Sequence, residues 1–188
     1  MARSTFHTQS QYTEMMTAAV MTDLSRVRND SFDQVVAEWQ VRILRTAYRI
    51  TGNWADAEDV AQEAFVRLHR HGLGFPNEAA LNGWLYRVTV NLCLDHRRAR
   101  RPAEELPEVR SLADSAEAAA IREQQKQRLL AALTRLAPKE RAAIVLREME
   151  GLSTAEVAEV LGSTEGNVRS QISKAMGRLR EIMNREQV

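Results

Sequence analysis

Apolar residues recur at helical spacing through almost the whole chain from Phe32 onward. The first apolar stripe repeats every three or four residues and ends at Gly52, a residue type that tolerates the positive φ found at helix ends. This stripe comprises Phe32, Val35, Val36, Trp39, Ile43, Ala47 and Ile50. The two-residue alternation typical of half-buried strands is not evident. The pattern therefore predicts an all-α protein.

Two further helices are expected before the middle of the chain. One runs from about Trp54 to Arg70, with Asn53 as its N-cap. Its inward residues are Ala57, Val60, Ala61, Ala64, Phe65 and Leu68, and its outer residues are Asp56, Asp59, Gln62, Glu63 and Arg67. A loop from His71 to Leu81 follows, then a helix from about Asn82 to Arg100. The buried stripe expected around this helix is Leu81, Trp84, Leu85, Val88 and Leu92.

The remaining segments suggest two helical domains around a connector. Residues 102–122 contain prolines and acidic residues, and we expect a flexible linker there. A last helical unit spans about Ile121 to Met183, with breaks near Pro138 and at Gly151. We place the domains at residues 31–101 and 123–188. Residues 1–30 show no strong pattern, and we expect a flexible extension.

The segment from Gly151 to Arg180 is typical of a helix-turn-helix. Ser153 and Glu156 form a capping box, Gly162 supplies the turn, and Thr164 caps the second helix. One face of this second helix is apolar: Val168, Ile172, Ala175, Met176, Leu179 and Met183. The opposite face, flanked by Arg169, carries small and basic residues: Gly166, Ser170, Ser173, Lys174 and Gly177. Such a helix can enter the DNA major groove. The alternative is an amphipathic hairpin with a solvated basic face.

Charge is segregated along the chain, although the net charge is only +1. Local clusters set the field that a phosphate backbone meets, so a small net charge does not exclude nucleic-acid binding. The acidic cluster is Asp56, Glu58, Asp59 and Glu63. The basic clusters are Arg97, Arg98, Arg100 and Arg101, and then Arg169, Lys174, Arg178 and Arg180.

Several functional classes are disfavoured by the residues present. A single cysteine, Cys93, excludes an internal disulfide and a cysteine-rich zinc site. The histidines show no evident metal-ligand spacing, and no phosphate-cradling loop or nucleophile–base pattern is evident. We therefore expect no enzyme activity, no cofactor and no metal. Because we find no secretory signal and no apolar run near ~18 residues, we expect a soluble, cytoplasmic protein without membrane insertion.

Two polar faces in the first domain could bind partners. The carboxylate and amide face of the helix from Trp54 suits a basic helical partner, although acidic residues early in a helix also complement its dipole. On the next helix Arg87, Asn91 and Arg98 share one flank with Leu94. Asn91 offers hydrogen-bonding groups for a base edge, and the arginines can hold phosphates. The alternative is an ordinary polar edge and a solvated helix end.

Taken together, these motifs resemble those of one family. The order is ADAEDVAQEAFVRLHRH, then WLYRVTVNLCLDHRRAR, a linker, and the helix-turn-helix. The chain from about Phe32 to Met183 resembles group IV sigma factors, the extracytoplasmic-function (ECF) type of bacterial RNA polymerase sigma subunit. The resemblance implies a sigma-2 domain at 31–101 and a sigma-4 domain at 123–188.

The resemblance also implies roles for individual positions. Asp59, Gln62 and Glu63 would bind the β′ clamp helices of core polymerase. Asn91 would contact a flipped-out base of the −10 element, with the loop from Gly72 to Leu81 forming its pocket. The arginines that would hold the −10 strands are Arg87, Arg97 and Arg98. The residues that would read the −35 element are Arg169, Ser170, Ser173 and Lys174.

The implied function is an alternative transcription initiation factor that binds core polymerase and promoter DNA and assists promoter melting. Family members are commonly held by an anti-sigma factor, so we expect such a partner. The main alternative is a helix-turn-helix repressor or response-regulator output protein, which would leave the acidic face and Asn91 unexplained. Catalysis is the weakest alternative.

Overall fold

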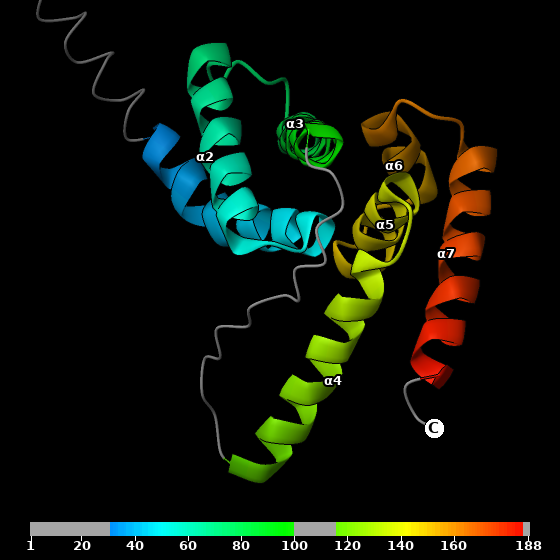
Figure 1. Ribbon diagram of the computed structural model, residues 1–188. Helices are drawn as coiled ribbons and strands as arrows, with labels where there is room; N and C mark the ends of the chain where they lie inside the picture. Colours follow the sequence, from blue (N-terminus) through cyan, green and yellow to red (C-terminus); the bar gives the residue numbers. More distant parts are fainter. Residues whose placement is uncertain (1–30, 100–115, 186–188) are drawn as a thin grey trace, which may run out of the picture. The chain divides into compact units, whose positions relative to one another are not determined.

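The computed structural model describes residues 31–99 and 116–185, and within these ranges every regular element is a helix (Figure 1). The first helix spans residues 31–51. The others are α2 (Trp54–His71), α3 (Glu78–Ala99), α4 (Ala116–Thr134), α5 (Pro138–Ile144), the π-helix η1 (Val145–Met149), α6 (Thr154–Leu161) and α7 (Glu165–Arg185). The all-α prediction is confirmed. The predictions for residues 1–30 lie outside the described residues.

The ends of the first two helices lie where the sequence predicted. Gly52 has a φ of +83°, and its N–H donates to the carbonyl oxygen of Tyr48 at 2.8 Å. Asn53 then caps α2, because its side-chain oxygen accepts from the Asp56 N–H at 3.0 Å. Side-chain caps of this kind satisfy backbone donors that the first helical turn leaves without partners.

Helix α2 packs on α3 through the apolar face that the sequence predicted. The buried residues of this face are Ala57, Val60, Ala61, Ala64 and Leu68, and Phe65 is half-buried. The expectation that Asp56 lies on the outer side was wrong, because this residue is only 9% exposed. Its place in the first turn, directly after the cap, brings it to the edge of the core.

Helix α3 begins four residues earlier than predicted. Asn77 acts as its cap, since its side-chain oxygen accepts from the Ala80 N–H at 2.9 Å. The buried face is also wider than the predicted stripe. It includes Tyr86, Thr89, Val90 and Cys93 beside Leu85 and Leu92, whereas Leu81, Trp84 and Val88 are half-buried. The reason is that α3 packs against α5 and α6 as well as α2.

The second half of the chain breaks near Pro138 and at Gly151, as predicted, but its first helix starts earlier. Helix α4 begins at Ala116, so residues 116–122 of the expected linker are helical. The turn after η1 is closed by Arg147, whose guanidinium donates to the Leu152 carbonyl oxygen at 2.8 Å. Helices α4, α5 and α6 all pack against α7. This scaffold holds α7 by its apolar face.

The local signals of the helix-turn-helix are confirmed. Ser153 and Glu156 form both hydrogen bonds of a capping box, and Gly162 ends α6 in the left-handed region with a φ of 56°. Thr164 caps α7 through the Asn167 N–H at 3.3 Å. The fully buried residues of α7 are Val168, Ala175 and Leu179, which leaves the opposite face to solvent.

Candidate nucleic-acid and partner interfaces

The outer face of α2 presents a compact polar group. Asp59 and Gln62 are exposed, and Glu63 is partly exposed on the next position along this face. The Arg67 guanidinium donates to the Glu63 carboxylate at 2.8 Å. This hydrogen bond lowers the pKa of Glu63 from its ordinary value. The three predicted docking residues thus lie together, on the side of α2 away from its buried face, where an incoming helix can reach them.

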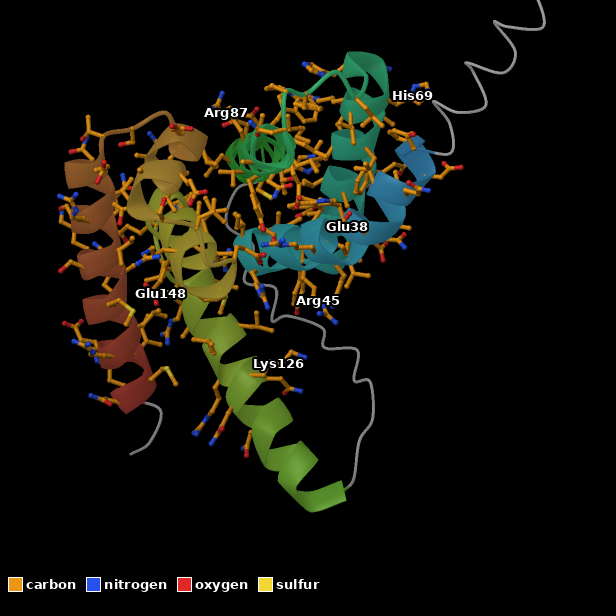
Figure 2. All side chains as sticks on the ribbon, turned by 180° about the vertical axis from the view of Figure 1, so that it is seen from behind. Glu38, Arg45, His69, Arg87, Lys126 and Glu148 are labelled. Carbon is orange, nitrogen blue, oxygen red and sulfur yellow. The ribbon has the colours of Figure 1, made fainter. Side chains whose placement is uncertain are left out.

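The outer flank of α3 carries the predicted −10 residues. Arg87 (Figure 2) and Asn91 are both exposed, and they lie about one helical turn apart in the sequence of α3. Arg97 and Arg98 belong to the last turns of α3, and their side chains lie outside the described residues. Because Asn91 is exposed, the donor and acceptor groups of its amide can meet a ligand.

An aromatic cluster beside this flank was not singled out from the sequence. The His71 and Phe75 rings stack with centroids 4.9 Å apart, and Trp84 lies 5.0 Å from His71 and 5.8 Å from Phe75. These residues join the end of α2, the loop and the first turns of α3. The signal that could have revealed the cluster is the three aromatic rings flanking a short loop with Gly72, Gly74 and Pro76.

The exposed face of α7 brings together all four predicted −35 residues. Arg169, Ser170, Ser173 and Lys174 are exposed and lie opposite the buried stripe. Serine side chains are short, so the helix backbone can approach a ligand closely, and the flanking cations can reach phosphates. Arg169 forms an ion pair with Glu165 at 2.6 Å. Exposed pairs of this type contribute ~0.3–0.5 kcal/mol, so a phosphate can replace the Glu165 carboxylate.

The one cysteine of the chain, Cys93, lies in the core. Cys93 is fully buried, its thiol lies 3.9 Å from the Ala47 carbonyl oxygen, and burial raises its pKa to about 12. In the part of the chain that the structure describes, no group of His, Cys, Asp and Glu side chains could hold a metal ion. A search of the same residues finds no helix long and apolar enough to cross a membrane.

Comparison with known proteins accounts for both halves of the chain. The family model "Sigma-70 region 2" matches residues 35–102, and "Sigma-70, region 4" matches residues 126–179. The ECF RNA polymerase sigma factor SigM of Mycobacterium tuberculosis is 35% identical over 81% of this chain and 77% of its own length. The chain belongs to the ECF sigma factors. This is not an enzyme family, and the match to region 2 accounts for the first domain, which a helix-turn-helix repressor would leave unexplained.

Other relatives agree with this assignment. The ECF RNA polymerase sigma factor SigE of Mycolicibacterium smegmatis is 40% identical to this protein. The match covers 81% of this chain and 62% of the length of SigE. The crystal structure of M. tuberculosis SigJ, an ECF sigma factor, matches with a TM-score of 0.60 and 33% identity over 77% of this chain and 52% of that one. The sigma factor RpoE of Bartonella quintana, solved with the anti-sigma factor NepR, shares the fold with a TM-score of 0.68 at 21% identity, over 82% of this chain and 97% of that one.

Proposed function

We propose that this protein is an alternative sigma factor that binds core RNA polymerase and directs it to promoters with specific −35 and −10 elements. The observation that carries the proposal is the match to regions 2 and 4 together, in an order that puts an acidic face first and a DNA-reading helix last. The residues at 31–101 act as the sigma-2 domain, those at 102–122 as the linker, whose last seven residues form the start of α4, and those at 123–188 as the sigma-4 domain. Since its partners are polymerase and DNA, the protein works in the bacterial cytoplasm.

Docking to polymerase is assigned to the α2 face. Asp59 and Glu63 provide carboxylates and Gln62 an amide within one turn of helix, which fits a basic partner helix of the β′ clamp. A DNA backbone would be repelled by the same charges, so this face does not compete for the promoter. Asp56 is left out of this group because it is buried.

Recognition of the −10 element is assigned to the outer flank of α3. Trp84, Arg87 and Asn91 follow at spacings of three and four residues, so they lie along one face of the helix. Extruding a base from the duplex costs a few kcal/mol of stacking, which contacts with the flipped base must offset. In this proposal Asn91 meets the base edge, the loop beside the aromatic cluster shapes the pocket, and Arg87, Arg97 and Arg98 hold the strands.

Recognition of the −35 element is assigned to the exposed face of α7. Ser170 and Ser173 lie between two cations, Arg169 and Lys174, which is the arrangement expected of a helix that approaches DNA through its small residues. Tethering this reader to the −10 reader raises their effective concentration for each other, so neither should bind a promoter well alone.

Regulation by an anti-sigma factor is also proposed. Its support is that the B. quintana relative of the same fold was solved with an anti-sigma factor. For this chain, such a partner would have to cover the α2 face to prevent polymerase binding, or the α3 flank to prevent recognition of the −10 element.

The docking assignment is tested by measuring affinity for purified core polymerase, with fluorescence anisotropy of labelled protein. We expect the double variant Asp59→Ala/Gln62→Ala to bind at least roughly tenfold more weakly, because interfacial hydrogen bonds to charged groups contribute about 1.5–3 kcal/mol each. Glu148→Ala is the matched control, since it removes an exposed carboxylate from η1. Equal core affinity for the double variant and the control would refute the assignment.

A further inference from the structure

Two carboxamide side chains lie beside the proposed −35 residues on the first half of α7. Asn167 is exposed and Gln171 is half-buried. They are four residues apart in the sequence, so they lie about one turn apart on one side of the helix. At about 3.6 residues per turn, Asn167 lies roughly 20° from Lys174 around the helix axis, and Gln171 lies about 40° further round. The two amides therefore extend the exposed −35 face along one edge.

Contacts at both ends of this edge fix the rotation of α7. Thr164 Oγ1 accepts a hydrogen bond from the backbone N–H of Asn167 at 3.3 Å, which leaves the carboxamide of Asn167 available. Arg178, seven residues after Gln171 on the same side of the helix, donates to the carboxylate of Glu140 in α5 at 2.7 Å. The Glu140 side chain is only 12% exposed, so this ion pair is partly shielded from salt. The packing against α5 thus holds the amide edge of α7 in one position.

Gln171 carries an acceptor that has no donor. Its Oε1 atom is buried and has no hydrogen-bond partner among the residues that the structure describes. Such an acceptor has lost water without a replacement, which costs free energy, and most buried polar atoms in proteins are paired for this reason. Since Gln171 is only half-buried, rotation of its long side chain can bring the oxygen to the surface. A hydrogen-bond donor from a bound partner would then satisfy it.

The donor and acceptor of a carboxamide match one base in the major groove. Adenine presents its N7 acceptor beside its N6 amino donor, so the side-chain nitrogen and oxygen of Asn or Gln can meet both at once. Guanine presents two acceptors, N7 and O6, and would place one of them opposite the carboxamide oxygen. Arg169 and Lys174 on the same face can instead meet phosphates or guanine. The amide edge therefore adds a preference for adenine that the two cations do not supply.

We propose that Asn167 and Gln171 are specificity-determining residues that read adenine, on either strand, in the −35 element. The inference rests on the proposed function, because it needs α7 in the major groove of promoter DNA, where the first turns of a recognition helix contact base edges. Four residues of helix span about 6 Å, which is close to two steps of ~3.4 Å between stacked base pairs. The two amides thus read two adenines that lie no more than about two base-pair steps apart.

The test uses holoenzyme assembled from purified core polymerase and the full chain. It is bound to a promoter library in which the −35 element is randomised and the −10 element is taken from a promoter that the protein transcribes. Sequencing of the bound DNA should show adenine enriched about fivefold or more at two positions, because bidentate amide contacts discriminate strongly against other bases. Asn167→Ala should abolish the enrichment at one position and Gln171→Ala at the other. The rest of the −35 preference should persist, which unfolding could not produce.

A protein control and a change in the DNA sharpen the test. Asn184→Ala is the matched control, since Asn184 is an exposed asparagine near the other end of α7, and it should leave every position unchanged. The base analogue 7-deazaadenine lacks the N7 acceptor. At the position that depends on Asn167, it should weaken binding of the wild type by roughly fivefold or more and binding of Asn167→Ala by less than about twofold.

The outcomes separate this inference from the proposed function. A −35 preference without adenine would overturn the inference alone. So would an adenine preference that Asn167→Ala or Gln171→Ala leaves intact at both positions, or an equal effect of 7-deazaadenine on the wild type and Asn167→Ala. Holoenzyme that selects no promoter DNA, beside a control sigma factor that does, would overturn the proposed function and this inference with it.

Discussion

The capping box of α6 gives a stability prediction that can be worked from two hydrogen bonds. The Glu156 N–H donates to Ser153 Oγ at 3.2 Å, and the Ser153 N–H donates to the Glu156 carboxylate at 2.7 Å. Ser153→Ala removes the first bond and leaves a donor of the first turn to water. Loss of a serine cap costs about 1 kcal/mol, within a range of 0.5–2 kcal/mol. For a chain of this length, that corresponds to a Tm lower by about 2–4 °C.

The same box predicts a pH dependence. The hydrogen bonds with Ser153 lower the pKa of Glu156 below its ordinary value. Since the folded pKa is the lower one, the stabilisation is present above the unfolded pKa of about 4.3 and is lost as pH falls through the folded pKa. The side chain is largely exposed, so the effect is small. Glu156→Gln keeps a hydrogen-bonding side chain at this position but removes this pH dependence.

The assay is urea unfolding followed by circular dichroism at pH 7 and at pH 4. Ser153→Asp is the matched control, because aspartate is an equally good cap and should retain most of the stability. At pH 7 we expect the order wild type, then Ser153→Asp, then Ser153→Ala, with about 1 kcal/mol between the first and last. If Ser153→Ala is as stable as the wild type at pH 7, the capping argument is refuted.

Three further outcomes follow from the described surfaces and core. Cys93 should react with a thiol reagent at pH 8 at least about a hundredfold more slowly in the folded protein than in urea, since folding raises its pKa to about 12 from an unfolded value near 8.5. Because the fold favours the neutral thiol, the stability that Cys93 contributes declines as pH rises above about 8.5. Rapid labelling of the native protein would contradict the burial of Cys93. Asn91→Ala should reduce open-complex formation, measured by permanganate footprinting, while core affinity stays within about twofold; unchanged melting on all promoters would remove Asn91 from the −10 site. Lys174→Ala should lower the salt dependence of −35 DNA binding by about one phosphate contact, whereas Lys139→Ala on α5 should not, and equal slopes for the two variants would contradict the −35 assignment.

Much of the fold could be predicted because its signals are local. Asn53, Ser153 and Gly162 act on backbone groups within four residues of themselves, so sequence spacing alone indicates where α2 and α6 begin and where α6 ends. The early start of α3 has a similar signal in Asn77, which is followed by Glu78 in the first turn, whereas the apolar stripe alone predicts a start near Asn82.

The missed features depend on contacts between distant segments. Tyr86 reads as an ordinary residue on the flank of an amphipathic helix, yet it is buried and contacts Glu150 and Arg42, which lie far from it in the sequence. Burial raises the pKa of its phenol, and the nearby Glu150 carboxylate raises it further. Glu150 itself lies in a run of charged residues before Gly151 and carries no periodic signal. The exposed candidate faces are easier to predict from the sequence, because helical geometry determines which residues lie opposite a buried stripe.

Run-off transcription with purified bacterial core polymerase tests the central claim most directly. The reaction is run with and without this protein on a pool of promoter fragments, beside a known sigma factor as control. We predict specific transcripts that appear only when the protein is present, with shared −35 and −10 sequences upstream of their starts. Transcripts from the control sigma factor but none from the folded, core-bound protein would contradict the claim that it directs promoter recognition.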